Sequence, residues 1–206
     1  MNLYVIKVIR CDYIKNPNKM VKKEIRVIGI DDSPFNKFKD KKILVVGVVM
    51  RGGSWIDGIL STKVDVDGDD STKKIAEMIN KCKFKPQLQC IFLDGIAVGG
   101  FNIIDVQELN KKTKLPVMVI IRRHPDIEKI KKTLTKIKKQ QKIKLIEKAG
   151  EVIKLDNIFV QLTGIDLEKA RKILKIVCTR SLIPEPIRLA HLIASGITVG
   201  ESKGRA

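Results

Sequence analysis

Aspartates are the residues of this chain whose type and spacing could do chemistry. Seven of them are candidates: Asp31, Asp32, Asp67, Asp69, Asp70, Asp94 and Asp105. Mg²⁺ prefers one or two carboxylates, with waters and phosphate oxygens as its other ligands. Two such ions about 3.5–4 Å apart activate a water and stabilise the leaving oxygen in phosphodiester cleavage. The aspartates therefore predict a divalent-cation site.

Several of these aspartates also have a structural alternative. Asp70 precedes a predicted helix, where it would be a plain N-cap, and Asp67-Gly68 would be a turn. Asp94-Gly95 is typical of a turn too, although the apolar segment before it favours a strand-end site equally. Two adjacent acids serve neither a core nor an ordinary turn, so Asp31-Asp32 is the pair hardest to explain by packing.

Histidine and cysteine patterns exclude other chemistries. The chain has two histidines, His124 and His191, and four scattered cysteines. Neither a Ser-His-Asp nor a Cys-His arrangement is visible, and the ligand spacings of a structural zinc site are absent. Arg122, Arg123 and His124 follow a predicted strand and form either a phosphate clamp or a merely basic loop. His191 lies on the last predicted helix, where we expect a structural role.

Basic residues outnumber acidic ones by 41 to 23, so the formal net charge is +18. Residues 111–148 hold fourteen Lys and Arg against three acids, whereas residues 57–70 have a net charge of −4. A basic segment beside acidic residues suits a metal-dependent enzyme that acts on a polyanion, because lysines hold phosphates through counterion release. The alternatives are a solvated helical surface and a lysine-rich composition without a binding role. Aromatic residues are few, so no stacking platform for single-stranded bases is evident.

Length and composition limit the class of protein. A chain of 206 residues that is 44% hydrophobic can bury a core, which excludes wholesale disorder. Its longest apolar run, Leu115–Ile121, is far shorter than the ~20 residues of a membrane helix, and no signal peptide is visible. We expect a cytoplasmic protein with a single domain at residues 23–199, an extension at 1–22 and a tail at 200–206.

Hydrophobic periodicity predicts an α/β fold. Three strands separated by turns should pair as an antiparallel meander, after which helices and strands alternate. The predicted strands are Glu24–Ile30, Ile43–Met50, Trp55–Val66, Leu88–Leu93, Pro116–Ile121 and Ile158–Leu162, with one more at Leu3–Ile9 in the extension. The predicted helices are Ser71–Cys82 after Asp70, Asn102–Lys112, Asp126–Lys139, residues 140–149, Asp166–Cys178 and Ile187–Ala194.

The order of these elements brings two aspartates together. A right-handed crossover after the third strand places the fourth strand beside the first. Asp31 and Asp94 then meet at the carboxyl end of the sheet, where open α/β sheets bind their ligands.

Five segments resemble an uncharacterised, mainly archaeal family that is similar to endonuclease V, within the ribonuclease H-like superfamily. They are RVIGIDDSPF at 26–35, VDGDDST at 66–72, IFLDGIAVGGFNIID at 91–105, PVMVIIRRHPD at 116–126, and PEPIRLAHLIASG with GES at 184–202. The resemblance implies a ribonuclease H-like mixed five-stranded sheet of order 3-2-1-4-5 with helices on both faces.

The resemblance to endonuclease V also implies a metal site. Asp31 and Asp94 match two metal-binding acids of that enzyme. Its third acid is a Glu in an FRE motif that this chain lacks, and we assign Asp70 to that position, with Asp67 and Asp69 close by. The PYIPG wedge of the enzyme, which probes the deaminated base, is also absent, so specificity for deoxyinosine or inosine is not expected to transfer.

Three hypotheses about function follow. The first is a Mg²⁺- or Mn²⁺-dependent nuclease in which the catalytic, metal-binding residues are Asp31, Asp94 and Asp70 and the substrate-binding residues are Arg122, Arg123 and His124. The second is a non-catalytic protein that binds DNA or RNA on a degenerate nuclease scaffold. It is favoured by the missing FRE motif and by residues 162–165, which lack the further active-site histidine of endonuclease V. The third is an interaction protein unrelated to nucleic acid.

Overall fold

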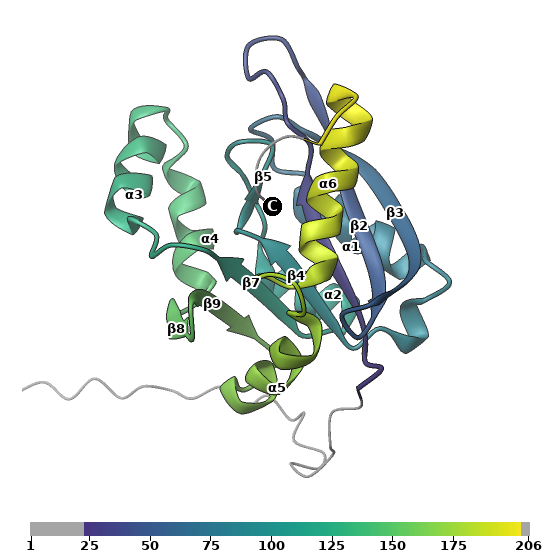
Figure 1. Ribbon diagram of the computed structural model, residues 1–206. Coiled ribbons are helices and arrows are strands. Elements are labelled where there is room, and N and C mark those ends of the chain that lie inside the picture. Colours follow the sequence, from purple (N-terminus) through teal and green to yellow (C-terminus); the bar gives the residue numbers. More distant parts are fainter. Residues whose placement is uncertain (1–22, 203–206) are drawn as a thin grey trace, which may run out of the picture.

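The computed structural model describes residues 23–202. Its centre is a seven-stranded sheet of order β3-β2-β1-β4-β7-β9-β8, beside a small β5-β6 hairpin (Figure 1). The strands are β1 (Arg26–Asp32), β2 (Lys42–Arg51), β3 (Trp55–Asp65), β4 (Cys90–Asp94), β5 (Ala97–Val98), β6 (Asn102–Ile103), β7 (Val117–Ile121), β8 (Ile153–Leu155) and β9 (Ile158–Thr163). The helices are α1 (Ser71–Lys81), α2 (Val106–Thr113), α3 (Ile127–Lys136), α4 (Ile143–Lys148), α5 (Leu167–Val177) and α6 (Glu185–Val199), with 3₁₀ turns η1 (Lys85–Gln87) and η2 (Gln140–Lys142).

Helices cover both faces of the sheet. On one face the core contains Ile75 of α1 and Leu109 of α2, and on the other it contains Ile173 of α5 and Ile187 of α6. The inner strands β1, β2 and β4 are buried along almost their whole length. Continuous apolar strands are typical of a sheet that is covered on both sides, and this is why their sequence shows little alternation.

The predicted strand order 3-2-1-4-5 is confirmed as β3-β2-β1-β4-β7. The first three strands form the antiparallel meander, and β4 and β7 run parallel to β1. Two further strands, β9 and β8, extend the sheet beyond the expected five and pair antiparallel. β9 is the predicted strand Ile158–Leu162, whereas β8 has only three residues, too few for a period to be visible. The predicted strand Leu3–Ile9 lies outside the described residues.

One predicted helix begins later than expected. Asn102–Ile103 is strand β6, and α2 begins only at Val106. Asp105 is therefore the N-cap of α2, and its side chain accepts a hydrogen bond from the backbone N–H of Glu108 at 2.9 Å. The predicted helix Asn102–Lys112 was wrong in its first turn. An aspartate such as Asp105 can either cap a helix or lie within it, and the apolar residues before it do not distinguish the two.

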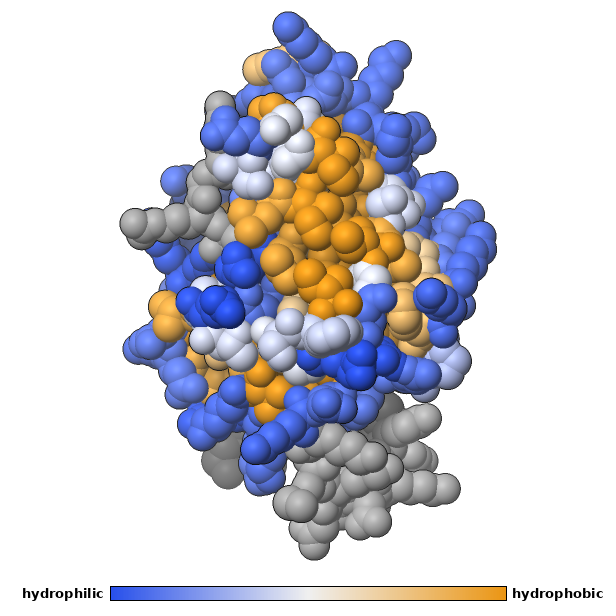
Figure 2. Space-filling model, turned by 45° about the vertical axis from the view of Figure 1, so that its right-hand side comes forward, coloured by the Kyte–Doolittle hydropathy of each residue, from blue (hydrophilic) through white to orange (hydrophobic). Residues whose placement is uncertain are grey.

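Helix α6 leaves apolar side chains at the surface. Figure 2 shows apolar side chains gathered on one face of the molecule, the face on which α6 packs against β2. Leu189 and Ile193 are half-buried against β2 residues such as Val48, and Ile59 and Ile197 are exposed. Between residues 23 and 202, no helix is long and apolar enough to cross a membrane.

Candidate functional site

Two aspartates lie side by side where the parallel strands β1 and β4 end. Ile30 pairs with Leu93, so the next residues along the two strands are Asp31 and Asp94. They face an open cleft of about 580 Å³. The cleft is lined by Asp31, Asp32, Ser33, Pro34, Phe35, Asp94, Gly95, Ile120, Ile121, Arg122 and His191. Asp31 and Asp94 are therefore neighbours at the carboxyl end of the sheet, as expected from the right-handed crossover.

Asp31 is the most buried acid of the cleft, with 5% of its surface exposed. One carboxylate oxygen accepts a hydrogen bond from the backbone N–H of Asp32 at 2.9 Å, and the other lies 2.9 Å from Nδ1 of His191. Burial raises the pKa of Asp31 to about 8, and the negative charges of Asp94 and Asp32 act in the same direction. A buried carboxyl group among like charges is stabilised by a cation placed between them.

Asp32 connects the cleft to the β5–β6 hairpin. Its Oδ2 accepts a hydrogen bond from the backbone N–H of Gly99 at 2.8 Å, and Gly99 adopts a left-handed backbone with φ +56°. Burial raises the pKa of Asp32, while the Gly99 hydrogen bond opposes the rise. Asp32 was among the candidate aspartates but not among the three assigned ligands, and its place in the cleft makes it a positioning group for this loop.

Of the three residues predicted to bind substrate, Arg122 alone lines the cleft. Its Nη2 lies 2.9 Å from Oδ2 of Asp94. Arg123 is exposed, and His124 packs edge-on against Phe159 with 5.2 Å between ring centroids. Successive side chains at the end of an extended strand point in different directions, so three consecutive residues after β7 do not reach one site.

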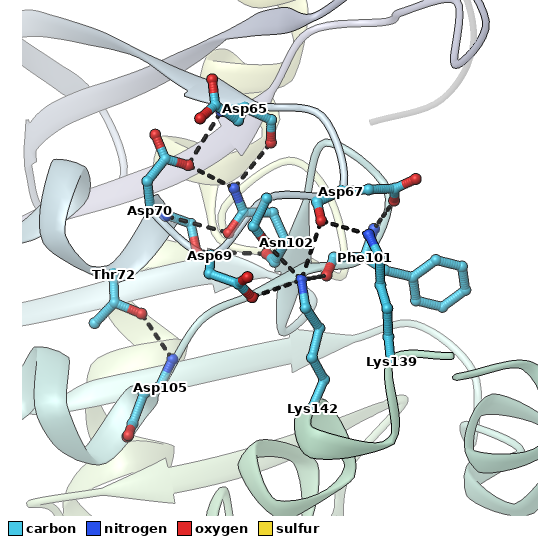
Figure 3. A network of polar contacts seen from close by, with 12 residues as sticks. Asp65, Asp67, Asp69, Asp70, Thr72, Phe101, Asn102, Asp105, Lys139 and Lys142 are labelled. Atoms are coloured by element: carbon cyan, nitrogen blue, oxygen red, sulfur yellow. Dashed lines mark hydrogen bonds and ion pairs between the residues drawn. The ribbon is translucent and has the colours of Figure 1, made fainter. Parts of the chain in front are cut away.

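Asp70, the expected third ligand, does not lie in the cleft. Its Oδ1 accepts hydrogen bonds from Nδ2 of Asn102 at 2.8 Å and from the backbone N–H of Asp65 at 3.1 Å (Figure 3). Asp70 stands at the N-cap position of α1 but makes no side-chain cap hydrogen bond there. In this position it joins the end of β3 to β6, a role that its place before a helix did not indicate.

His191 lines the cleft, although its place on the last predicted helix led us to expect a structural role. Its ring reaches Asp31 from α6, and its Nε2 is buried without a hydrogen-bond partner among the described residues. A signal was available, because His191 lies in the matched segment PEPIRLAH, although a helical histidine at that position is equally compatible with packing. Residues 162–165, which align with the active-site histidine of endonuclease V, hold no histidine in this chain. The imidazole of the cleft comes from α6 instead.

The motif before His191 fixes the start of α6. Glu185 is 2% exposed, and its carboxylate accepts a hydrogen bond from the backbone N–H of Arg180 at 3.0 Å and one from Nε of Arg188 at 2.8 Å. Gly29 of β1 lets the helix approach, because a Cβ at Gly29 would lie 2.4 Å from the backbone nitrogen of Ile187. The residues PEPIR thus fix the position of α6 along β1, and with it the position of His191 beside Asp31.

The donor atoms of the cleft fit a magnesium or manganese ion. Within residues 23–202, no three His, Cys, Asp or Glu side chains are grouped closely enough to enclose a metal ion. Mg²⁺ does not need such a cage, because one or two carboxylates suffice when waters and substrate phosphates complete the shell. Asp31 and Asp94 supply that pair, and the unpartnered Nε2 of His191 is a polar atom that a ligand in the cleft would satisfy.

Comparison with known proteins places these features in a family. A family model described as "Endonuclease dU" matches residues 23–198. A UPF0215 protein of Methanothermobacter thermautotrophicus is 47% identical over 193 residues, which cover 91% of this chain and 95% of the relative. These matches confirm the expected resemblance to an uncharacterised archaeal family.

Solved structures show the same fold. The crystal structure of a protein of unknown function from Archaeoglobus fulgidus has a TM-score of 0.78 and 40% identity, covering 84% of this chain and 97% of that one. Endonuclease V of Ciona intestinalis, in complex with a 24mer DNA containing an inosine followed by a ribo-adenosine, has a TM-score of 0.50 and 20% identity over 80% of this chain and 82% of that chain. The expected ribonuclease H-like, endonuclease V-like architecture is confirmed.

Proposed function

We propose that this chain, which belongs to the Endonuclease dU family, is a divalent-metal-dependent endonuclease. It would cleave phosphodiester bonds of nucleic acid. The observation that carries the proposal is the meeting of Asp31 and Asp94 at the ends of adjacent parallel strands, in a cleft that also contains Arg122 and His191. Two carboxylates can hold the metal of metal-assisted phosphodiester hydrolysis, a guanidinium can bind phosphate, and an imidazole can transfer a proton.

Each of these residues has a separate task. Asp31 and Asp94 hold the Mg²⁺ or Mn²⁺, which when bound supplies an acidic water and neutralises phosphate charge. Arg122 binds a non-bridging phosphate oxygen, since a guanidinium matches that geometry. His191 orients Asp31 through Nδ1, and its imidazole is the group that can transfer a proton during cleavage.

The family name supports a substrate class. The family is named Endonuclease dU, which makes DNA that contains deoxyuridine the first substrate to test. The endonuclease V structure with inosine-containing DNA makes deoxyinosine the second. The missing PYIPG wedge is the reason for placing deoxyinosine second.

The test is cleavage of end-labelled duplexes that contain one deoxyuridine, one deoxyinosine or no modified base. Each is incubated with Mn²⁺, Mg²⁺ or EDTA and with the wild type, Asp31→Asn, Asp94→Asn, or the control Asp156→Asn, whose side chain is 66% exposed. We expect metal-dependent cleavage that falls at least about 100-fold in both cleft variants and is retained by the control. Cleavage that persists in both cleft variants would contradict the proposal.

Asp70→Asn belongs in the same experiment. If Asp70 is the third metal ligand, as the resemblance implies, this variant loses cleavage to the same degree as Asp31→Asn. Its hydrogen bonds to Asn102 and Asp65 instead support a structural role. With that role, Asp70→Asn lowers thermal stability and leaves metal-dependent cleavage largely intact.

One observation favours a second candidate, a nucleic-acid-binding protein on a degenerate nuclease scaffold. The ion pair between Arg122 and Asp94 already neutralises one of the two carboxylates. Gel shifts with the same duplexes distinguish the candidates, because a degenerate site binds DNA without cleaving it and does so equally in wild type and both cleft variants. Absence of both binding and cleavage would favour an interaction protein.

A further inference from the structure

The segment from Asp126 to Ala149 forms a lobe at the same end of the sheet as the cleft. It consists of α3, η2 and α4, and it begins four residues after Arg122 (Figure 1). We call it the lysine lobe, since residues 126–149 hold nine lysines and three acids. Its apolar side chains pack through Leu134 and Ile146 on Ile103 of the β5–β6 hairpin. The lobe therefore has a small core of its own.

A buried lysine anchors this lobe. The side chain of Lys142 is 2% exposed, and its ammonium group lies 2.8 Å from Oδ1 of Asp69. The same ammonium donates to the backbone carbonyls of Asp67, Gly68 and Phe101 (Figure 3). A buried charge is costly without its partners, so these four oxygens hold the lobe in one position against the loops that carry them.

Hydrogen bonds link this anchor to the cleft. The backbone N–H of Asp67 donates to the carbonyl of Gly99 at 2.8 Å, and the N–H of Gly99 donates to Asp32 at 2.8 Å. The N–H of Asp32 in turn donates to Asp31. The lysine lobe and the cleft carboxylates are thus parts of one hydrogen-bonded framework, so a ligand held by the lobe has a defined place relative to the cleft.

The outer surface of the lobe carries cations without counter-charges. Five of its lysines are exposed and have no ion pair to any residue between 23 and 202: Lys129, Lys132, Lys136, Lys138 and Lys144. Three of them, at i, i+3 and i+7 of α3, share one helix face. That face extends over about 10 Å, which suits consecutive phosphates of a polynucleotide better than a single small anion.

The lobe lacks the aromatic side chains on which unpaired bases stack. Residues 126–149 contain no Phe, Tyr or Trp, and single strands are held largely by bases stacking on such rings. Lysine contacts to phosphate need only a backbone and are independent of base sequence. A backbone-only surface favours a polynucleotide whose bases already stack in a duplex.

We infer that the lysine lobe is the arm that holds the phosphate backbone of duplex DNA beside the cleft. This inference rests on the proposed function and extends it by naming the surface and the strandedness of the substrate. Lys129, Lys132 and Lys136 contact the backbone, and Lys142 keeps them in register with Asp31 through the hairpin.

The test compares two triple variants that remove the same charge. The lobe variant is Lys129→Gln, Lys132→Gln and Lys136→Gln. The control variant is Lys81→Gln, Lys169→Gln and Lys175→Gln, which changes exposed lysines without ion pairs on α1 and α5. Binding to a duplex of about 20 base pairs and to one of its single strands is measured by fluorescence anisotropy in EDTA, between about 50 and 200 mM salt.

We expect the lobe variant to bind the duplex at least about tenfold more weakly than the wild type, with the slope of log K against log salt reduced by about 2–3. The control should stay within about twofold at the same salt. Mn²⁺-induced thermal stabilisation should be equal in all three proteins, which shows that the cleft is intact.

Two results would overturn the inference: a lobe variant that binds duplex as the control does, or a wild type that binds the single strand as tightly as the duplex. Because binding is measured without metal, an inactive cleft would end the proposed nuclease function and leave this test valid.

Discussion

Asp31 has a strongly raised pKa in the folded protein. In the unfolded chain its pKa is near 3.8, whereas burial and the neighbouring Asp94 and Asp32 raise it to about 8 in the folded protein. Between these two values the folded state binds a proton that the unfolded state has released. The free energy of unfolding therefore falls as pH rises from about 4 to about 8 and is level above that range. A divalent cation opposes this loss because it takes the place of the proton.

Replacing this carboxyl group removes the titration. In EDTA above pH 8, Asp31→Asn should raise the melting temperature by roughly 2–8 °C, because the amide keeps most of the packing and carries no charge. The difference from wild type should shrink toward pH 4. Mn²⁺ should stabilise the wild type and leave Asp31→Asn unchanged, as followed by thermal unfolding.

Asp156→Asn is the matched control, since it makes the same chemical change on an exposed side chain. It should keep both the pH dependence and the Mn²⁺ response of the wild type. An equal Mn²⁺ response in Asp31→Asn would show that the ion binds elsewhere.

Among the elements, the contact of α6 with β1 decides whether a site exists. Gly29 leaves no room for a side chain, because a Cβ there would lie 2.4 Å from backbone atoms of both Pro186 and Ile187. The glycine at position 29 is therefore required by the close approach of α6 to β1, on the face of the sheet to which Asp31 also points. That helix carries His191, so the glycine acts on the site indirectly.

Gly29→Ala should destabilise the protein by about 3 kcal/mol or more, at the upper end of the effects of overpacking. Its Mn²⁺ response should weaken because α6 is displaced from Asp31. Gly150→Ala is the comparison, with φ +86° and no atom within 4 Å of its Cβ, and should cost only about 1–2 kcal/mol of backbone strain. Urea unfolding measures both, and equal losses would contradict the packing argument.

Lys142 is the buried polar anchor of α3 and α4. Lys142→Met should destabilise the lobe by about 1–3 kcal/mol, because the carbonyls of Gly68 and Phe101 lose their donor. The carbonyl of Asp67 still accepts a hydrogen bond from Lys139 at 2.6 Å. Lys144→Met, two residues away and exposed, should change stability by less than about 0.5 kcal/mol. Hydrogen exchange of residues 126–149 is the measurement. Unchanged exchange in Lys142→Met would mean that apolar packing and Lys139 hold the lobe without the buried ammonium group.

At the scale of the whole molecule, the charge of +18 predicts binding that depends steeply on salt. If five or more phosphates are contacted, affinity for duplex DNA should fall roughly 10²–10³-fold between about 50 and 200 mM salt. A salt titration in EDTA measures this slope. Binding that is independent of salt would show that the lysine excess has no electrostatic role.

The antiparallel meander and the meeting of Asp31 with Asp94 could be predicted from the residues alone, whereas the full order 3-2-1-4-5 came from the family resemblance. The apolar segments were long enough to show five strands, and their connections left few topologies, since parallel crossovers are right-handed. Adjacent parallel strands end at the same edge, so two acids that follow them must be neighbours. The lysine-rich segment could also be identified from the sequence. Which of its lysines are exposed without an ion pair among residues 23–202 could not.

Only the tertiary structure decided which other residues join the site. His191 reaches Asp31 across 160 residues because α6 packs on Gly29, and Asp70 is held away from the cleft by Asn102. Lys142 is buried although Gln141 and Lys144 are exposed. Periodicity describes which face of an element is apolar, but these contacts depend on how close two elements approach and at what height they meet, and that is set by side-chain packing between segments far apart in the chain.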